Sequence, residues 1–126
     1  RVFAALDRLA PAHAVLTSNT AGLSIAALAA ATARPERVMG WHWFQPASVM
    51  TLAELIVHER TSDAVRDTIV AVAKSCGKYP VVVRDWQYAW GFVSNRIMEV
   101  CRTSSVCSQR LTAGNDFNVL RVSRSN

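Results

Sequence analysis

Gly40-Trp41-His42-Trp43-Phe44-Gln45-Pro46 and Leu52-Ala53-Glu54-Leu55-Ile56-Val57 are the two stretches that decide the fold of this chain. Each is a short apolar run that carries one titratable side chain, His42 in the first and Glu54 in the second. Apolar runs of this length, bounded by turn residues, are typical of buried strands. If the two strands are neighbours in a sheet, the connection at 45–51 folds Glu54 back beside His42.

A carboxylate beside His42 would give this histidine a specific chemistry. When it binds one ring nitrogen, it fixes the tautomer and raises the basicity of the other nitrogen. Such a pair can take a proton from a substrate hydroxyl. The alternative is a buried histidine and a solvated glutamate that never meet, because spacings of this kind are common.

The sequence on either side of these stretches predicts alternating helices and strands. The predicted helices cover residues 2–9, 25–32 and a segment from the cap at Thr61 or Ser62 to Gly77, and the predicted strands cover 14–17, 37–44, 52–57 and 79–83. This alternation fits the second half of a nucleotide-binding α/β domain. The chain has no Gly-x-Gly-x-x-Gly turn, so the phosphate-binding first βαβ unit is not among these residues.

Several local features make predictions that a structure can test. Ser24 is a favourable N-cap for the helix at 25–32. Gly40 inside a strand indicates a close backbone approach or a bend. The strand at 14–17 is expected to be buried on both faces. The third helix is expected to bury one apolar side, made of Val65, Ile69, Val72 and Cys76. The aromatic segment at 85–90 is expected to be a linker or domain junction.

A polar loop, Ser18-Asn19-Thr20-Ala21-Gly22, separates the predicted strand at 14–17 from the next helix. Open α/β sheets bind their ligands at the carboxyl ends of strands, just before a helix. This position therefore favours contact with a cofactor or substrate. The alternative is an ordinary strand-to-helix turn, because small polar residues are common in turns.

Composition narrows the class of protein. The 126 residues are 51% hydrophobic and 18% charged, which is typical of a globular domain. No apolar run reaches the ~18 residues that a membrane helix needs, so no membrane span is expected. The net charge of +5 comes without a compact basic cluster or interleaved aromatics, which argues against nucleic-acid binding. The three cysteines match no zinc-binding spacing, so no metal site is expected, and a reducing compartment, the cytoplasm, is favoured.

The motifs described so far form an ordered set with three further pieces. The set comprises Ser18-Asn19-Thr20, His-aromatic-Phe-polar-Pro at 42–46, Val49-Met50, Glu54, Gly77-Lys78-Tyr79-Pro80-Val81 and Gly91-Phe92-Val93-Ser94-Asn95-Arg96. In this order the set resembles the catalytic segment of the NAD-dependent 3-hydroxyacyl-CoA dehydrogenases. The resemblance covers roughly residues 1–100.

The resemblance implies an α/β fold and a division of the chain. Residues 1–85 would be the C-terminal half of a Rossmann-like NAD-binding domain. Residues 86–126 would be a junction and the truncated start of an all-α domain, including its first helix. The chain is then expected to be a fragment that is inactive alone, from a protein that is a homodimer at full length.

The resemblance also implies a reaction and a role for each matching residue. In this family a hydride passes between C3 of a 3-hydroxyacyl-CoA substrate and NAD, which oxidises the 3-hydroxyl to a 3-keto group in fatty acid metabolism. The implied catalytic residues are His42, as general acid/base, and Glu54, its carboxylate partner. The implied substrate-binding residues are Ser18 and Asn95, the latter reaching His42 across the interdomain cleft, and the implied cofactor-binding residues are Asn19, Ala21 and Gln45.

The chain departs from the family pattern at three places. Ala21 stands where the family usually has a serine, and Gln45 stands where it usually has an asparagine. The segment at 86–90 replaces a Pro-Gly. Two alternatives therefore stay open: a non-catalytic, crystallin-like structural relative, and a sister dehydrogenase that acts on another hydroxyacid.

Overall fold

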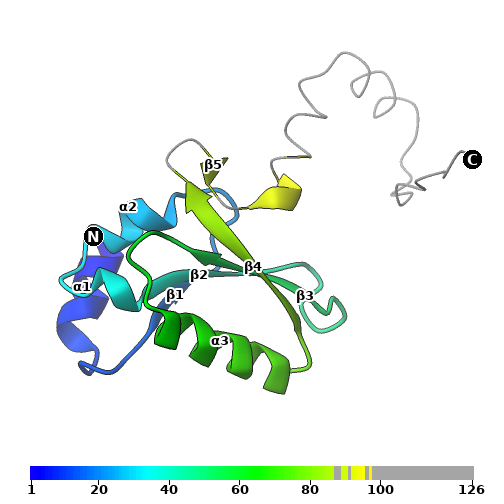
Figure 1. The fold of residues 1–126 in the computed structure, drawn as a ribbon, viewed down its shortest axis with the longest axis horizontal. Helices are drawn as coiled ribbons and strands as arrows, with labels where there is room; N and C mark the ends of the chain where they lie inside the picture. The colour runs from blue at the N-terminus through cyan, green and yellow to red at the C-terminus, as the bar shows by residue number, and fades with distance from the viewer. Residues whose placement is uncertain (87–88, 91, 96, 98–126) are drawn as a thin grey trace, which may run out of the picture. The chain divides into compact units, whose positions relative to one another are not determined.

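A computed structural model of the chain describes residues 1–86, 89–90, 92–95 and 97. The elements, in chain order, are α1 (Val2–Leu9), β1 (Leu16–Ser18), α2 (Ile25–Ala29), the 3-10 helix η1 (Pro35–Arg37), β2 (Val38–Trp43), β3 (Leu52–Val57), α3 (Asp63–Ser75), β4 (Tyr79–Trp86) and β5 (Ala89–Trp90) (Figure 1). Residues Arg1–Asn95 form one compact unit. The predicted domain boundary after residue 85 stays a prediction, and two of the three cysteines, Cys101 and Cys107, lie outside the described residues, as does most of the predicted start of an all-α domain.

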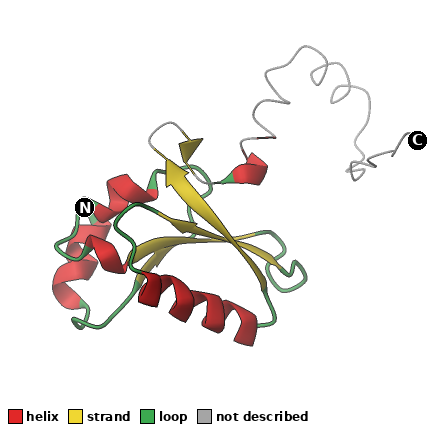
Figure 2. Ribbon diagram, in the orientation of Figure 1, coloured by secondary structure: helices red, strands yellow, loops and turns green. Residues whose placement is uncertain are grey.

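The strands form one mixed sheet in the order β1-β2-β3-β4-β5. β1 and β2 are parallel, as are β3 and β4, whereas β2 with β3 and β4 with β5 are antiparallel. Along the chain a helix comes before β1, β2 and β4, whereas β3 follows β2 without a helix between them (Figure 2). The predicted α/β class is confirmed. Within the described ranges, no helix is both long and apolar enough to cross a membrane.

The two faces of the sheet bury two separate apolar clusters. Successive residues of a strand point to opposite faces, so neighbouring positions of β2 join different clusters. The cluster on the α2 side consists of Ile25, Ala29, Val38, Ile56 and Phe92. The cluster on the α3 side consists of Met39, Leu55, Val65 and Ile69. By this alternation, His42 faces the same side as Val38, which is the α2 side.

Local signals position the helices as the sequence predicts. The Ser24 hydroxyl accepts a hydrogen bond from the Ala27 amide at 3.2 Å and so caps α2. Ser62 caps α3 in the same way, and Gly77, with φ of 71°, ends the turn that follows that helix. Helix α2 is shorter than predicted and ends at Ala29, whose carbonyl accepts a hydrogen bond from the Thr32 hydroxyl at 2.7 Å.

Two burial predictions are wrong. Val72 is 40% exposed and Cys76 is exposed, whereas α3 buries Val65, Ile69 and Ala73. The buried positions are four residues apart, and Cys76 comes after the last helical residue, so neither of the two exposed residues lies on the side that packs against the sheet. Strand β1 is only half-buried, because among the described strands it has a neighbour on one side.

The segment at 85–90, predicted as a linker or domain junction, belongs in part to the sheet. β4 continues through Trp86 and pairs with β5, with Asp85 opposite Trp90. The Asp85 carboxylate accepts hydrogen bonds from the Ser24 hydroxyl at 3.1 Å and the Ala26 amide at 2.8 Å. These bonds fix the end of β4 to the first turn of α2, and the strand continues past the valines because its end pairs with β5.

Gly40 allows α2 to approach the sheet beside the predicted site. A Cβ atom at this position would lie 2.9 Å from Cβ of Ile56 and 3.1 Å from Cδ1 of Ile25. We expect Gly40→Ala to lower the free energy of unfolding by about 1–3 kcal/mol, because this core has no room for the added methyl group. Chemical denaturation followed by circular dichroism measures the change. Gly22→Ala is the matched control, since nothing lies within 4 Å of its Cβ position; equal stability of the two variants would contradict the prediction.

Candidate active site

His42 and Glu54 face each other across β2 and β3. The antiparallel register pairs the two residues directly, and Nδ1 of His42 lies 2.9 Å from Oε2 of Glu54. Both are buried, at 7% and 4% exposure. A carboxylate only accepts hydrogen bonds, so the proton of the neutral ring lies on Nδ1. Nε2 then has a free lone pair and is the ring nitrogen that can accept a proton from a further partner.

Two aromatic rings enclose the imidazole. The Phe44 ring centroid lies 4.7 Å from that of His42, and the Phe92 centroid lies 5.4 Å away in an edge-on arrangement. Phe92 is 1% exposed and belongs to the cluster beneath α2. Apolar walls of this kind keep water away from the ring and strengthen electrostatic interactions near it.

The second carboxylate oxygen of Glu54 is also engaged. Oε1 accepts a hydrogen bond from the Ser94 hydroxyl at 2.8 Å and one from the Ser94 backbone amide at 3.3 Å. Residues 93–95 are helical and follow Phe92 directly. One short segment therefore supplies both a ring against His42 and two donors to its carboxylate partner.

The loop after β1 is held at the ends of the two parallel strands. Asn19 Oδ1 accepts a hydrogen bond from the Trp43 amide at 2.8 Å, which ties the loop to the end of β2. The Ser18 hydroxyl accepts one from the Thr20 amide at 3.3 Å. This bond uses one lone pair of the Asn19 carboxamide oxygen, so the NH₂ group and the second lone pair are the parts that can meet a ligand.

The remaining predicted site residues lie around this loop and the connection after β2. Nδ2 of Asn95 donates a hydrogen bond to the Ala21 carbonyl at 2.6 Å. Gln45 is exposed and precedes a cis peptide bond to Pro46. Among the described residues, Gln45 makes no hydrogen bond to the other predicted site residues. The structure therefore joins His42 with Glu54 and Asn95 with Ala21, and leaves Gln45 apart.

Lys78, from the Gly-Lys-Tyr-Pro motif, fixes the connection between β2 and β3. Its ammonium group donates hydrogen bonds to the carbonyl of Ala47 and, at 2.8 Å, to that of Met50. It also lies 5.0 Å from the centroid of the Trp43 ring, within the range of a cation–π contact. These contacts shape the connection that begins with Gln45.

Sequence reasoning missed three residues that support the site. Phe92 and Ser94 lie in a motif from which only Asn95 was given a role, and Asp85 lies in the segment expected to be a linker. The contacts of Ser94 and Asp85 span 40 and 61 residues, so no local periodicity marks them. A carboxylate two residues after a run of valines was the one signal that could have drawn attention to Asp85.

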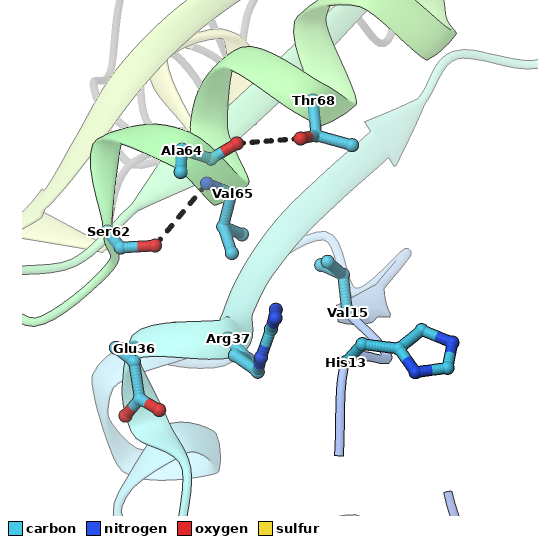
Figure 3. Close-up of a pocket in the computed structure, with 8 residues that line it drawn as sticks. All are labelled: His13, Val15, Glu36, Arg37, Ser62, Ala64, Val65 and Thr68. Carbon is cyan, nitrogen blue, oxygen red and sulfur yellow. Dashed lines mark hydrogen bonds between the residues drawn. The ribbon is translucent and has the colours of Figure 1, made fainter. Parts of the chain in front are cut away.

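A separate pocket lies at the opposite ends of the parallel strands. Its volume is about 470 Å³ and it is lined by His13, Val15, Glu36, Arg37, Ser62, Ala64, Val65 and Thr68 (Figure 3). These residues precede β1 and β2 or form the start of α3. None of the predicted site residues lines it, so the pocket is distinct from the His42–Glu54 pair.

Comparison with known proteins adds to this geometry. The sequence model of the family described as "3-hydroxyacyl-CoA dehydrogenase, NAD binding domain" matches residues 1–86. A probable 3-hydroxybutyryl-CoA dehydrogenase of Bacillus subtilis is 43% identical over 97 residues, which is 77% of this chain and 33% of that protein. A fatty acid oxidation complex subunit alpha of Shewanella amazonensis is 44% identical over 93 residues, 74% of this chain and 13% of that protein.

Solved structures agree with the sequence comparison. The crystal structure of (S)-3-hydroxybutyryl-CoA dehydrogenase from Ralstonia eutropha is similar with a TM-score of 0.76 and 34% identity, over 90% of this chain and 40% of that one. This similarity confirms the predicted Rossmann-like fold. The chain spans about a third or less of the length of the two curated relatives. Through residues 1–86, the chain belongs to the 3-hydroxyacyl-CoA dehydrogenase family, in its NAD-binding domain.

Proposed function

We propose that this chain supplies the catalytic histidine and part of the cofactor site of an NAD-dependent 3-hydroxyacyl-CoA dehydrogenase. The reaction oxidises the 3-hydroxyl of an acyl-CoA to a 3-keto group in fatty acid metabolism. One observation carries the proposal: a buried histidine, held at Nδ1 by a carboxylate 2.9 Å away, in a chain of this family. We propose further that the enzyme works as a homodimer in the cytoplasm.

His42 acts as the general acid/base in this proposal. Nε2 takes the proton of the C3 hydroxyl during oxidation and returns it in the reverse direction. Glu54 holds the ring in the Nδ1–H tautomer and stabilises the imidazolium that forms. Phe44 and Phe92 limit access of water, so that the transferred proton stays between substrate and ring. Proton transfer by a positioned side chain contributes about 10²- to 10⁴-fold in rate.

The residues present fit one end of NAD. The loop at 18–22 lies at the carboxyl ends of parallel strands, where α/β sheets bind dinucleotides, and Asn19 offers an NH₂ group there, with its oxygen bonded to the Trp43 amide. Bound NAD supplies the hydride acceptor. We propose that Asn19, Ala21 and Gln45 contact its nicotinamide end. The glycine-rich pyrophosphate turn is not among these residues.

Ser18 and Asn95 are the proposed substrate contacts. The bond from Asn95 Nδ2 to the Ala21 carbonyl orients the carboxamide and leaves its Oδ1 for the substrate. Ala21 has no side-chain group for hydrogen bonding, so one polar contact usual in the family is missing here. This loss favours a second candidate, a non-catalytic structural relative, and a sister dehydrogenase for another hydroxyacid is the third.

A chimaera tests the proposed function. Residues 1–95 of this chain replace the matching segment of the Bacillus subtilis relative, and NADH formation from 3-hydroxybutyryl-CoA is measured. Reduction of NAD at a rate well above that of a chimaera carrying His42→Ala is the expected result. The unmodified relative is the positive control, and the chain alone, in an NADH fluorescence titration, reports whether residues 1–126 bind the cofactor without that context.

The other outcomes separate the alternatives. Activity on a different hydroxyacid, with none on the acyl-CoA, would assign the sister dehydrogenase. A folded chimaera with no activity on any hydroxyacid tested would favour the structural relative. In that case, Ala21→Ser is the first reversion to examine, because it restores the missing hydroxyl.

A further inference from the structure

Ser94 holds Glu54 at the oxygen that His42 does not use. The Ser94 hydroxyl and its backbone amide converge on Oε1, at 2.8 Å and 3.3 Å, while Oε2 faces Nδ1 of His42 at 2.9 Å. Two donors on one oxygen and one on the other define the plane of the carboxylate. Because Glu54 is only 4% exposed, water has little access to replace a lost donor.

We infer that Ser94 is a positioning residue for the His42–Glu54 pair, an inference that rests on the proposed function. A carboxylate held at Oε1 cannot rotate away from the ring, so Oε2 stays in line with Nδ1–H. Among the hydrogen bonds of the described residues, Ser94 makes none to His42, so it acts through Glu54. Its effect is on the tautomer and orientation of the ring, and hence on how well Nε2 is prepared to accept a proton.

The position of Ser94 links two parts of the site. Phe92, two residues earlier, packs edge-on against His42, and Asn95, the next residue, donates to the Ala21 carbonyl in the loop after β1. A shift of this segment would therefore move the donor to Glu54, the wall of the ring and the proposed substrate amide together. Ser94 makes the pair dependent on the correct placement of residues 92–95.

The first test reads the tautomer in the full 126-residue chain. Nitrogen-resolved NMR at a pH where the rings are neutral separates Nδ1–H from Nε2–H imidazole. His58 is an internal reference of the opposite tautomer, because its Nδ1 accepts from the Arg60 amide at 3.3 Å and its Nε2 donates to the Pro35 carbonyl at 3.0 Å. We expect Ser94→Ala to convert a substantial fraction of His42 to the Nε2–H form, with the His58 signals unchanged.

Two variants make this test specific. Ser94→Thr keeps the hydroxyl and should restore the parent tautomer. Ser75→Ala removes an exposed serine hydroxyl from α3, which bonds only the Val72 carbonyl within the same helix, and should change nothing. If Ser94→Ala leaves His42 in the parent tautomer, as Ser75→Ala does, the inference is overturned. If Ser94→Ala unfolds the chain, the His58 signals are lost as well, and Ser94→Thr then decides. Parent His42 signals in Ser94→Thr support the role of the hydroxyl, and altered His42 signals contradict it.

The second test uses turnover in the chimaera. Ser94→Ala should lower kcat roughly 3- to 30-fold and leave KM for NAD unchanged, since the backbone amide keeps part of the contact. Recovery of kcat in Ser94→Thr supports positioning by the hydroxyl, whereas equal rates in Ser94→Ala and the parent contradict it. The two tests can also give different answers. An inactive parent chimaera would overturn the proposed function, whereas a tautomer change in the Ser94→Ala chain would still support the positioning of Glu54 by Ser94.

Discussion

Replacement of His42 by alanine should lower kcat of the active chimaera by about 10²- to 10⁴-fold, the range for loss of a positioned general acid/base. The imidazole is the group whose Nε2 is free to take the hydroxyl proton, since Nδ1 faces Glu54 at 2.9 Å. The affinity for NAD should stay close to that of the parent, because the proposed cofactor contacts lie on the loop at 18–22 and at Gln45. Steady-state kinetics and an NADH titration measure both quantities.

The control for this variant is His13→Ala, which removes an exposed imidazole outside the proposed site. It should keep the parent kcat. Because His42 is buried, its removal also leaves a cavity beside Glu54, so thermal melting must show that the variant is folded at the assay temperature. A folded His42→Ala variant with the parent kcat would remove this residue from the mechanism.

Glu54→Gln should lower kcat by an amount on the order of 10²- to 10³-fold, because the amide reverses the tautomer of His42. The amide has one accepting oxygen and one donating NH₂ group. In the parent, Ser94 directs two donors at Oε1 of Glu54, at 2.8 Å and 3.3 Å. The oxygen of the glutamine amide is therefore expected to take the place of Oε1 and face Ser94. The NH₂ group then faces His42, which turns Nδ1 into an acceptor and places the ring proton on Nε2, where it blocks proton uptake.

Glu59→Gln is the matched control, since Glu59 is exposed and follows β3 in the chain. It should leave kcat unchanged. Glutamine is nearly the same size as glutamate, so Glu54→Gln should keep the packing of the core. A lower kcat in this variant would therefore report the loss of the carboxylate and not a loss of folding. A parent rate in Glu54→Gln would mean that the carboxylate is a structural partner of the ring and has no part in proton transfer.

Much of the fold follows from local patterns. Strand β3 and helix α1 have the predicted bounds, α2 starts at its predicted cap Ser24, and α3 starts at Ser62, one of the two caps predicted for it. These elements are marked by apolar periodicity and by capping residues, which act over one or two turns of chain. The close approach expected at Gly40 is present as well. The wrong predictions, such as the burial of Cys76, concern which side of a helix or strand is buried. That side depends on the element that packs against it, which lies elsewhere in the chain.

The sequence by itself determined the alternating elements, the family and the two strands that bring a histidine opposite a glutamate. His42 and Glu54 meet because a short connection makes β2 and β3 neighbours, and because the alternation of side chains along each strand places both residues on the same face of the sheet. Only the tertiary structure decided that Ser94 holds Glu54, that Asp85 fixes α2 to β4 and that Asn95 meets Ala21, across 40, 61 and 74 residues of chain. Contacts at such separations depend on the path of the whole backbone, so no short stretch of sequence encodes them.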